Sequence, residues 1–200
     1  MDNLIKQAIN CLENNGLISL PTETVYSISC NALSNIAVDK IYDLKDRKRE
    51  NPLSLLIGSV KQAQDIVEFN QTALTLANKF FPGPLTIILK KLPCTTLANN
   101  INKNSNTIAI RMPKHDLTLS ILKSINFPII GTSANPSGQA PATDYTKVQE
   151  YFPQGLDMII DGGKADIGIA STVIDLSDKK LNIIRQGIIT ENQLKEVLWA

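Results

Sequence analysis

The sequence lacks an excess charge of either sign and lacks a long apolar run. Its 200 residues contain 20 lysines and arginines against 19 acids, for a net charge of +1. That balance excludes a strong overall electrostatic attraction to nucleic acid. The opening "MDNLIKQAINCLENNG" has an acid at position 2 and no signal-like apolar core, and no later run could span a bilayer. We therefore expect a cytoplasmic protein that has no membrane contact.

Metal-site and phosphate-loop motifs are also missing. There are three cysteines and one histidine, with no CxxC spacing, so we assign no metal ligand and expect the cysteines to be reduced. His115 is expected at the surface, without a role. The chain has neither a GxxxxGK[ST] loop nor a GxGxxG turn. A nucleotide would have to be held by side chains.

The residues that are present predict one globular domain over residues 1–200, since 43% are hydrophobic and 20% are charged. Apolar residues at helical spacing predict a first helix over about 4–12 that ends at Gly16 in a left-handed conformation. A second helix should run from Ser34 or Asn35 to Leu44. Ser59 and Gln62 form a capping-box signature for a third helix. Further helices are expected near 72–80, 115–125 and 144–151. Short runs rich in β-branched residues predict strands at "LISL", "LSLLIG", "LTIILK", "TIAIR", "PIIGT", "DMIID", "STVIDL" and "LNIIR". This irregular alternation favours an α/β (α+β-like) fold with a twisted mixed sheet and packed helices.

Polar segments stand at the ends of these elements. They are "PTET" at 21–24, "KDR" at 45–47, "TSANPSG" at 132–138, and "ST" at 171–172. Taken singly, each has an ordinary explanation as a turn, a solvated basic run or a loop. Their combination offers cations for a triphosphate and neutral donors and acceptors for a nucleobase or an amino acid.

A series of motifs from about residue 17 to 188 resembles the YrdC/TsaC family, the threonylcarbamoyl-AMP synthases. In order, the motifs are "PTETVY", "KDR" followed by "NPL", "FPGPLT", "IAIRMP", "GTSANPSG", "ASTVIDL" and "IIRQG". The resemblance is to the short, single-domain bacterial form and implies a YrdC-like fold. It also implies an enzyme that makes threonylcarbamoyl-AMP and pyrophosphate from L-threonine, bicarbonate and ATP. This is the first step of the threonylcarbamoyladenosine modification of tRNA.

The resemblance also implies roles for particular residues. The nucleotide signature and catalytic set would be Lys45, Arg47, Ser133 and Asn135. Further ATP contacts would be Asn51, Thr107 and Arg185, and threonine would contact Thr24, Arg111 and Ser171. Arg111 suits a carboxylate, because a guanidinium binds it through two parallel hydrogen bonds. Magnesium is expected on the phosphates, and the labile product would pass to TsaD, TsaB and TsaE proteins.

The sequence departs from the family pattern at the threonine site. Ser27 and Ser29 stand where the family usually has glycines, and Leu56 stands where it often has a histidine. If the glycine positions required positive φ, each serine would cost roughly 1 kcal/mol.

Other interpretations stay open. The alternative function is an RNA-binding module whose concave basic surface would use Lys45, Arg47, Lys48 and Arg49 on the backbone phosphates of an RNA such as tRNA. Another is a related enzyme on a similar fold that uses a different amino acid or carbamoyl donor. Arg111 could also be a structural ion-pair partner of a local acid such as Asp116.

Overall fold

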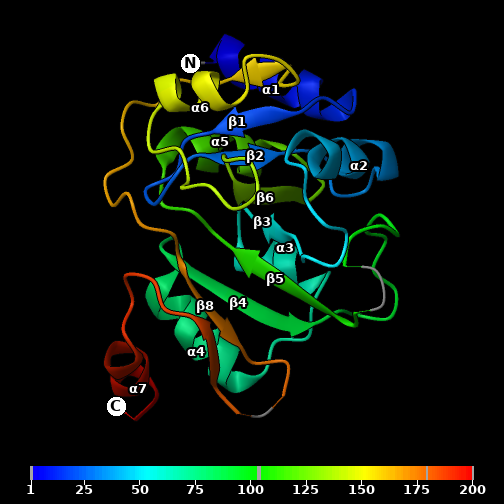
Figure 1. The fold of residues 1–200 in the computed structure, drawn as a ribbon. Coiled ribbons are helices and arrows are strands. Elements are labelled where there is room, and N and C mark those ends of the chain that lie inside the picture. Colours follow the sequence, from blue (N-terminus) through cyan, green and yellow to red (C-terminus); the bar gives the residue numbers. More distant parts are fainter. Residues whose placement is uncertain (1, 103–104, 179, 200) are drawn as a thin grey trace.

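The protein is built on a nine-stranded mixed sheet with strand order β7-β1-β2-β6-β3-β5-β4-β8-β9 (Figure 1). The computed structural model describes residues 2–102, 105–178 and 180–199. The strands are β1 (Ile18–Leu20), β2 (Ser27–Ser29), β3 (Ser54–Leu56), β4 (Leu85–Lys90), β5 (Thr107–Arg111), β6 (Ile129–Ser133), β7 (Met158–Ile159), β8 (Thr172–Asp175) and β9 (Asn182–Arg185). The helices are α1 (Asp2–Glu13), α2 (Asn35–Leu44), α3 (Val60–Gln64), α4 (Gln71–Phe80), α5 (Asp116–Ser124), α6 (Tyr145–Tyr151) and α7 (Glu191–Trp199). A mixed sheet with packed helices confirms the predicted fold class.

The pairing of the strands brings distant polar segments together. Strand β3 pairs in parallel with β5 and antiparallel with β6, so Leu56 lies beside Arg111 and Ser54 lies beside Gly131. Strand β2 pairs with β6 and places Ser27 beside Ser133. Strand β4 pairs with both β5 and β8. Arg111, at the end of β5, therefore lies beside the end of β3, which in turn pairs with the start of β6, and the start of β8 lies at the same level across β4.

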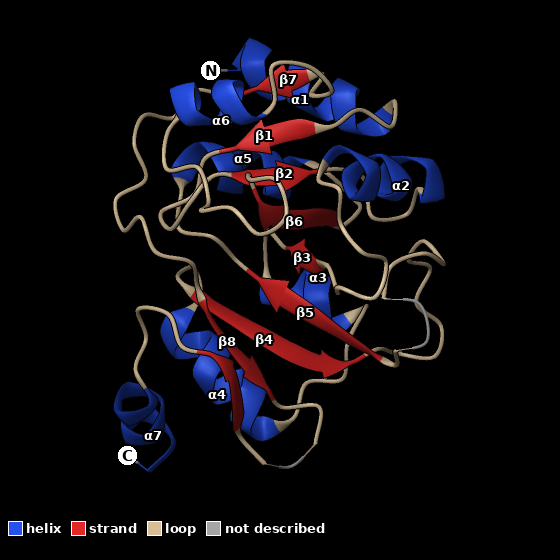
Figure 2. Cartoon of the chain, viewed as in Figure 1, coloured by secondary structure: helices blue, strands red, loops and turns tan. Residues whose placement is uncertain are grey.

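Two apolar clusters cover the sheet. Helices α1 and α5 pack on each other, and their buried residues join Ile18, Leu20 and Ile129 of the sheet in the smaller cluster. The larger cluster includes residues of α2, α4 and the middle strands. Helices α3 and α4 lie behind β5 and β4 in the view of Figure 2, and α7 packs against α4. Within the described residues, no helix has both the length and the apolarity needed to cross a membrane.

The predicted helix caps are found, with one correction. Ser34 Oγ accepts a hydrogen bond from Ala37 N at 3.2 Å and begins α2, whose predicted stripe of Val38, Ile41 and Tyr42 is buried. The expectation for Gly16 was wrong, because it is Asn15 that has the positive φ, at 60°. Position 16 needs glycine for a different reason, because the backbone there passes close to the end of α1. An added Cβ would lie 2.8 Å from the Cys11 carbonyl oxygen.

Strand β2 and helix α7 were not predicted from the sequence. Strand β2 contains Ser27 and Ser29, which are buried and do not have positive φ. The two serines therefore carry no left-handed strain, and the departure from glycine is accommodated in extended backbone.

Candidate active site

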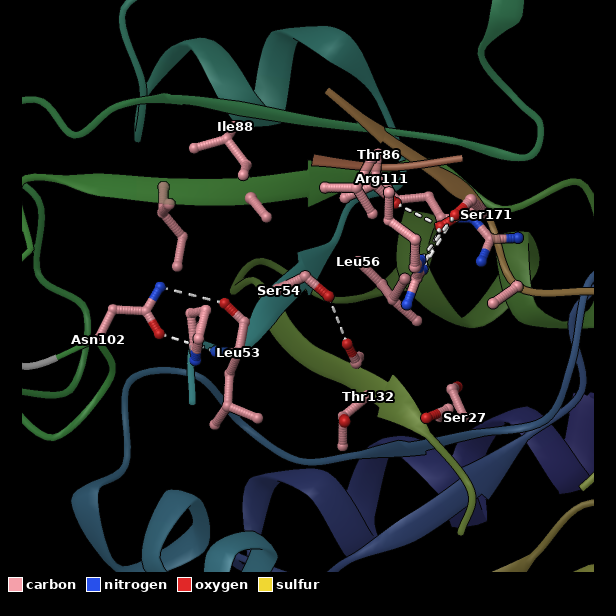
Figure 3. Close-up of a pocket in the computed structure, with 18 of the residues that line it drawn as sticks. Ser27, Leu53, Ser54, Leu56, Thr86, Ile88, Asn102, Arg111, Thr132 and Ser171 are labelled. Atoms are coloured by element: carbon pink, nitrogen blue, oxygen red, sulfur yellow. Dashed lines mark hydrogen bonds between the residues drawn. The ribbon is translucent and has the colours of Figure 1, made fainter. Parts of the chain in front are cut away.

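A cavity of about 750 Å³ lies over the middle strands of the sheet (Figure 3). Its walls come from β3, β4, β5, β6, β8 and β9, together with the turn after β1 and the segment after α2. The size is that of a small-molecule site. Among the predicted site residues, those that line it are Arg47, Thr107, Arg111, Ser133, Ser171 and Arg185. Thr24, Lys45, Asn51 and Asn135 do not belong to the lining.

Three of the arginines that line the cavity differ in whether they have an acidic partner: Arg47 and Arg185 have none in the described structure, and Arg111 has one. Arg47 donates to the Pro52 carbonyl at 2.8 Å, and Arg185 donates to the Ser171 carbonyl at 2.9 Å. Neither forms an ion pair with an acid in the described part of the chain. Burial lowers the pKa of both guanidiniums, and the charge of Arg111 lowers that of Arg185 further. Arg47 is half-buried and Arg185 is exposed. Two cations at one cavity, without acidic partners in the described structure, form a site suited to an anion.

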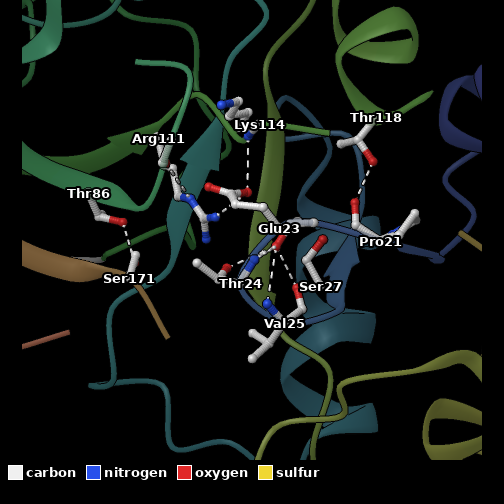
Figure 4. Close-up of polar contacts among 12 residues, drawn as sticks. Pro21, Glu23, Thr24, Val25, Ser27, Thr86, Arg111, Lys114, Thr118 and Ser171 are labelled. Atoms are coloured by element: carbon white, nitrogen blue, oxygen red, sulfur yellow. Dashed lines mark hydrogen bonds and ion pairs between the residues drawn. The ribbon is translucent and has the colours of Figure 1, made fainter. Parts of the chain in front are cut away.

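Arg111 is the cation that has an acidic partner. Its Nη2 lies 2.8 Å from Glu23 Oε2, and its Nε donates to the Gly83 carbonyl at 3.2 Å (Figure 4). The suggested structural partner Asp116 was wrong, because the acid comes from the turn after β1. Burial lowers the pKa of Arg111, and Glu23 opposes that shift by favouring the charged form. Arg111 is thus both an ion-pair member and part of the cavity wall.

The hydroxyls of "PTET" build the turn that interrupts the apolar strand. Thr22 Oγ1 donates to the Val25 carbonyl at 2.6 Å and accepts from the backbone N–H groups of Thr24 and Val25. Thr24 Oγ1 lies 2.9 Å from the same Thr22 hydroxyl, and Thr24 is fully buried. Thr22 and Val25, on either side of Thr24, do line the cavity.

Lys45 and Arg47 point to different places although only one residue separates them. Lys45 is 1% exposed, and its Nζ donates to the carbonyls of Ser133 and Asn135. Asn135 Oδ1 in turn accepts from Ser133 Oγ at 2.6 Å. Burial, followed by the charge of Arg47, lowers the pKa of Lys45 to about 7. Lys45 therefore fixes the Ser133–Asn135 turn from behind, while Arg47 faces the cavity.

Several lining residues received no role from the sequence. Ser171 Oγ lies 2.8 Å from Thr86 Oγ1, which places Thr86 beside a predicted threonine contact. Leu56 and Ser27 line the same cavity. Glu23 also received no role, although a carboxylate within a strand-end turn was a signal for a buried partner. His115 is half-buried rather than a surface residue, and its Nδ1 has no hydrogen-bond partner in the structure as described.

The cavity offers little to a metal ion. Within the described ranges, no group of three or more His, Cys, Asp or Glu side chains could hold one, and Glu50 is the one acid among the described lining residues. The residues do not fit a protein-held magnesium ion. A magnesium ion would have to enter on the phosphates of a nucleotide.

Comparison with known proteins gives consistent relatives. A family model named Sua5_yciO_yrdC, described as "Telomere recombination", matches residues 10–187. The chain is 37% identical over 200 residues to threonylcarbamoyl-AMP synthase of Bacillus subtilis (strain 168), covering 98% of this chain and 57% of that protein. It is 36% identical over 195 residues to the protein of that name from Pyrococcus abyssi (strain GE5 / Orsay), covering 97% of this chain and 57% of the relative. The chain thus spans little more than half the length of these two relatives.

Solved structures have the same fold. The crystal structure of P. abyssi Sua5 complexed with L-threonine superposes with a TM-score of 0.92 and 36% identity, over 97% of this chain and 57% of that one. E. coli YciO superposes with a TM-score of 0.88 over 97% of this chain and 94% of that one. At 23% identity, the second likeness supports the fold alone.

Proposed function

The chain belongs to the Sua5/YciO/YrdC family, and from this premise we propose that it is a threonylcarbamoyl-AMP synthase. Its substrates are L-threonine, bicarbonate and ATP, and its products are threonylcarbamoyl-AMP and pyrophosphate. One observation at the level of residues carries this proposal. A single cavity combines Arg47 and Arg185, which lack acidic partners in the described structure, with Arg111, which is paired to Glu23. An anionic nucleotide and an amino acid can bind there side by side.

The reaction needs positioning more than it needs a base. Threonine's amine and bicarbonate give a carbamate with loss of water, and a carbamate oxygen then attacks the α-phosphate as pyrophosphate leaves. The attacking oxygen is already anionic, so orientation and charge neutralisation carry the rate. This agrees with a cavity whose described lining contains arginines and hydroxyls but no histidine.

We assign Arg47, Arg185 and Thr107 to the nucleotide, with Ser133 at the edge of its site. Lys45 and Asn135 act by holding the Ser133 turn, and Asn51 supports Arg47 through its carbonyl, 3.4 Å from Arg47 Nε. Arg111 binds the carboxylate of threonine, and Ser171 and the turn containing Thr24 complete that site. ATP enters as its magnesium complex, and no step uses a protein-held metal.

The RNA-binding alternative has less support from the basic cluster than its sequence suggested. Lys45 is buried, and Arg49 forms ion pairs with Asp39 and Asp43. Only Arg47 and Lys48 of that cluster are then left to contact phosphates. Within the proposed role, we retain a cytoplasmic single domain over residues 1–200 that passes its product to TsaD, TsaB and TsaE proteins acting on tRNA.

Pyrophosphate release tests the proposal directly. The protein is incubated with ATP, bicarbonate and each amino acid in turn, and pyrophosphate is measured. We expect release with threonine, and weaker release with serine, because one methyl in an apolar niche is worth about 1–3 kcal/mol. Leu56 lines the cavity and supplies apolar surface for such a niche. No release with any amino acid would overturn the synthase, and equal turnover of serine and threonine would overturn the selectivity.

A further inference from the structure

Glu23 is buried beside the cavity without forming part of its described lining. Its side chain is 5% exposed, and Oε2 lies 2.8 Å from Arg111 Nη2. The same oxygen accepts a hydrogen bond from Lys114 N at 3.0 Å, while Oε1 is buried with no hydrogen-bond partner in the described structure. Figure 4 shows the carboxylate reaching from its turn to the guanidinium. The charge of this carboxylate is therefore compensated mainly by Arg111.

Arg111 is fixed by its place in the sheet and by two contacts of its side chain. It is the last residue of β5, its Nε donates to the Gly83 carbonyl at 3.2 Å, and its Nη2 forms the ion pair with Glu23. A flexible arginine held in this way loses little further freedom on binding a ligand. Glu23 therefore fixes the direction in which the guanidinium faces the cavity.

The pairing also changes the charge that a ligand meets. Arg185 is near enough to Arg111 for the charge of Arg111 to lower its pKa. Without Glu23, these two adjacent cations would attract any small anion, including phosphate. With Glu23, a negative charge stands behind Arg111. It attracts the ammonium group of an amino acid and repels a second negative charge.

We propose that Glu23 is a positioning and selectivity residue, which orients Arg111 and makes this part of the cavity prefer a zwitterionic amino acid to a simple anion. The proposal rests on the proposed function, because it takes the amino acid to be the ligand of Arg111. Glu23 acts through Arg111 and does not itself touch the reacting atoms.

Binding of two matched compounds tests the proposal. L-threonine and 3-hydroxybutyrate share the carboxylate, hydroxyl and methyl, but only threonine has the ammonium group. Affinities are measured by calorimetry without ATP, and inorganic phosphate is added as a competitor. The wild-type protein should prefer threonine, and Glu23→Gln should reduce that preference by about tenfold, the effect expected from removing one buried charge. Phosphate should compete better against the variant than against the wild type.

Kinetics separate positioning from a general loss of structure. In Glu23→Gln the KM for threonine should rise while the KM for ATP stays the same. Glu150→Gln is the matched control, because it makes the same change to an exposed ion pair with Lys147 on α6. A folded Glu23→Gln protein with the wild-type preference would overturn the proposal.

A second variant, which keeps the carboxylate, keeps the proposal testable if Glu23→Gln fails to fold. Glu23→Asp keeps the charge but shortens the side chain, so binding of both compounds should weaken while the preference for threonine stays. Wild-type affinity for threonine in this variant would also overturn the proposal. The synthase can fail separately, since a wild-type protein that binds threonine without releasing pyrophosphate leaves the binding comparison intact. A wild-type protein that binds neither compound would overturn both ideas.

Discussion

At the scale of single residues, Lys45 combines deep burial with the absence of an acidic partner in the described structure. Burial and the charge of Arg47 lower its pKa to about 7. The carbonyls of Ser133 and Asn135 act in the opposite direction, because they bind the ammonium more strongly than the neutral amine. The titration of Lys45 should then fall between about 7 and the ordinary value of 10.5.

This titration predicts a pH dependence of stability. The native protein gives up the Lys45 proton at a lower pH than the unfolded chain, so the unfolded chain binds more protons between about pH 7 and 10.5. The contribution of Lys45 to the free energy of unfolding therefore rises with pH across this window and is lost as pH falls towards 7. Urea unfolding of the wild type and Lys45→Met over this range measures the difference. A difference that does not change with pH would contradict the lowered pKa.

The sequence did not reveal the direction in which each predicted site residue points. The family resemblance placed Lys45 and Arg47 together in the nucleotide signature, yet Lys45 is buried behind the turn and, of the two, only Arg47 lines the cavity. The hydroxyl of Thr24 is already bonded to Thr22. Glu23 received no role because its partner Arg111 comes from a distant strand. Local spacing cannot encode such a contact, which depends on the pairing of the sheet.

At the scale of elements, the end of α2 explains why Lys45 and Arg47 diverge. Asp46 has a φ of 47°, its N–H donates to the Asp43 carbonyl at 3.2 Å, and the Arg47 N–H donates to the Tyr42 carbonyl at 2.9 Å. This is the Schellman pattern, in which the residue after the helix cap adopts the left-handed conformation. The reversal sends Lys45 inward and turns Arg47 towards the cavity.

The protein should therefore be more stable with glycine at position 46 than with alanine. Asp46→Gly and Asp46→Ala both remove the carboxylate, but only glycine adopts positive φ without strain. We expect the glycine variant to exceed the alanine variant in free energy of unfolding by about 1 kcal/mol. The control pair is Lys6→Gly and Lys6→Ala at an exposed position of α1, where alanine should be the more stable by roughly 0.5–1 kcal/mol. Denaturant unfolding measures both pairs, and the same order at both positions would contradict the left-handed cap.

Elements with strong local signals were predicted, and the missed strand lacks such a signal. Ser34 and Ser59 both accept the expected capping hydrogen bonds, from Ala37 N and Gln62 N. Strand β2 has three residues, two of them serine, and it exists because β1 and β6 pair with it on both sides. Its stability comes from tertiary pairing, so a short sequence window does not reveal it.

At the scale of the whole molecule, the strand order assembles one cavity from segments spread along the chain. Strand β5 lies between β3 and β4, and β8 lies beyond β4, so Arg111 and Ser171 reach a space that Arg47 enters from the end of α2. A ligand in this cavity contacts both halves of the sheet only when the protein is folded. Each substrate should therefore stabilise the native state by linkage.

Arg47 and Arg111 should control separate parts of that stabilisation. At a hundredfold excess over Kd, threonine or an α,β-methylene analogue of ATP should each raise the free energy of unfolding by about 2.7 kcal/mol. Arg47→Ala should lose most of the effect of the analogue and keep that of threonine. Arg111→Lys should do the reverse, because an ammonium cannot reproduce the planar two-point contact with a carboxylate. Thermal or urea unfolding with each ligand measures the four combinations, and Lys48→Ala, an exposed neighbouring cation, should keep both effects. Separate subsites require that Arg47→Ala loses only the stabilisation by the ATP analogue and Arg111→Lys only the stabilisation by threonine. If each variant lost both stabilisations equally, the assignment of the two arginines to separate subsites would be wrong.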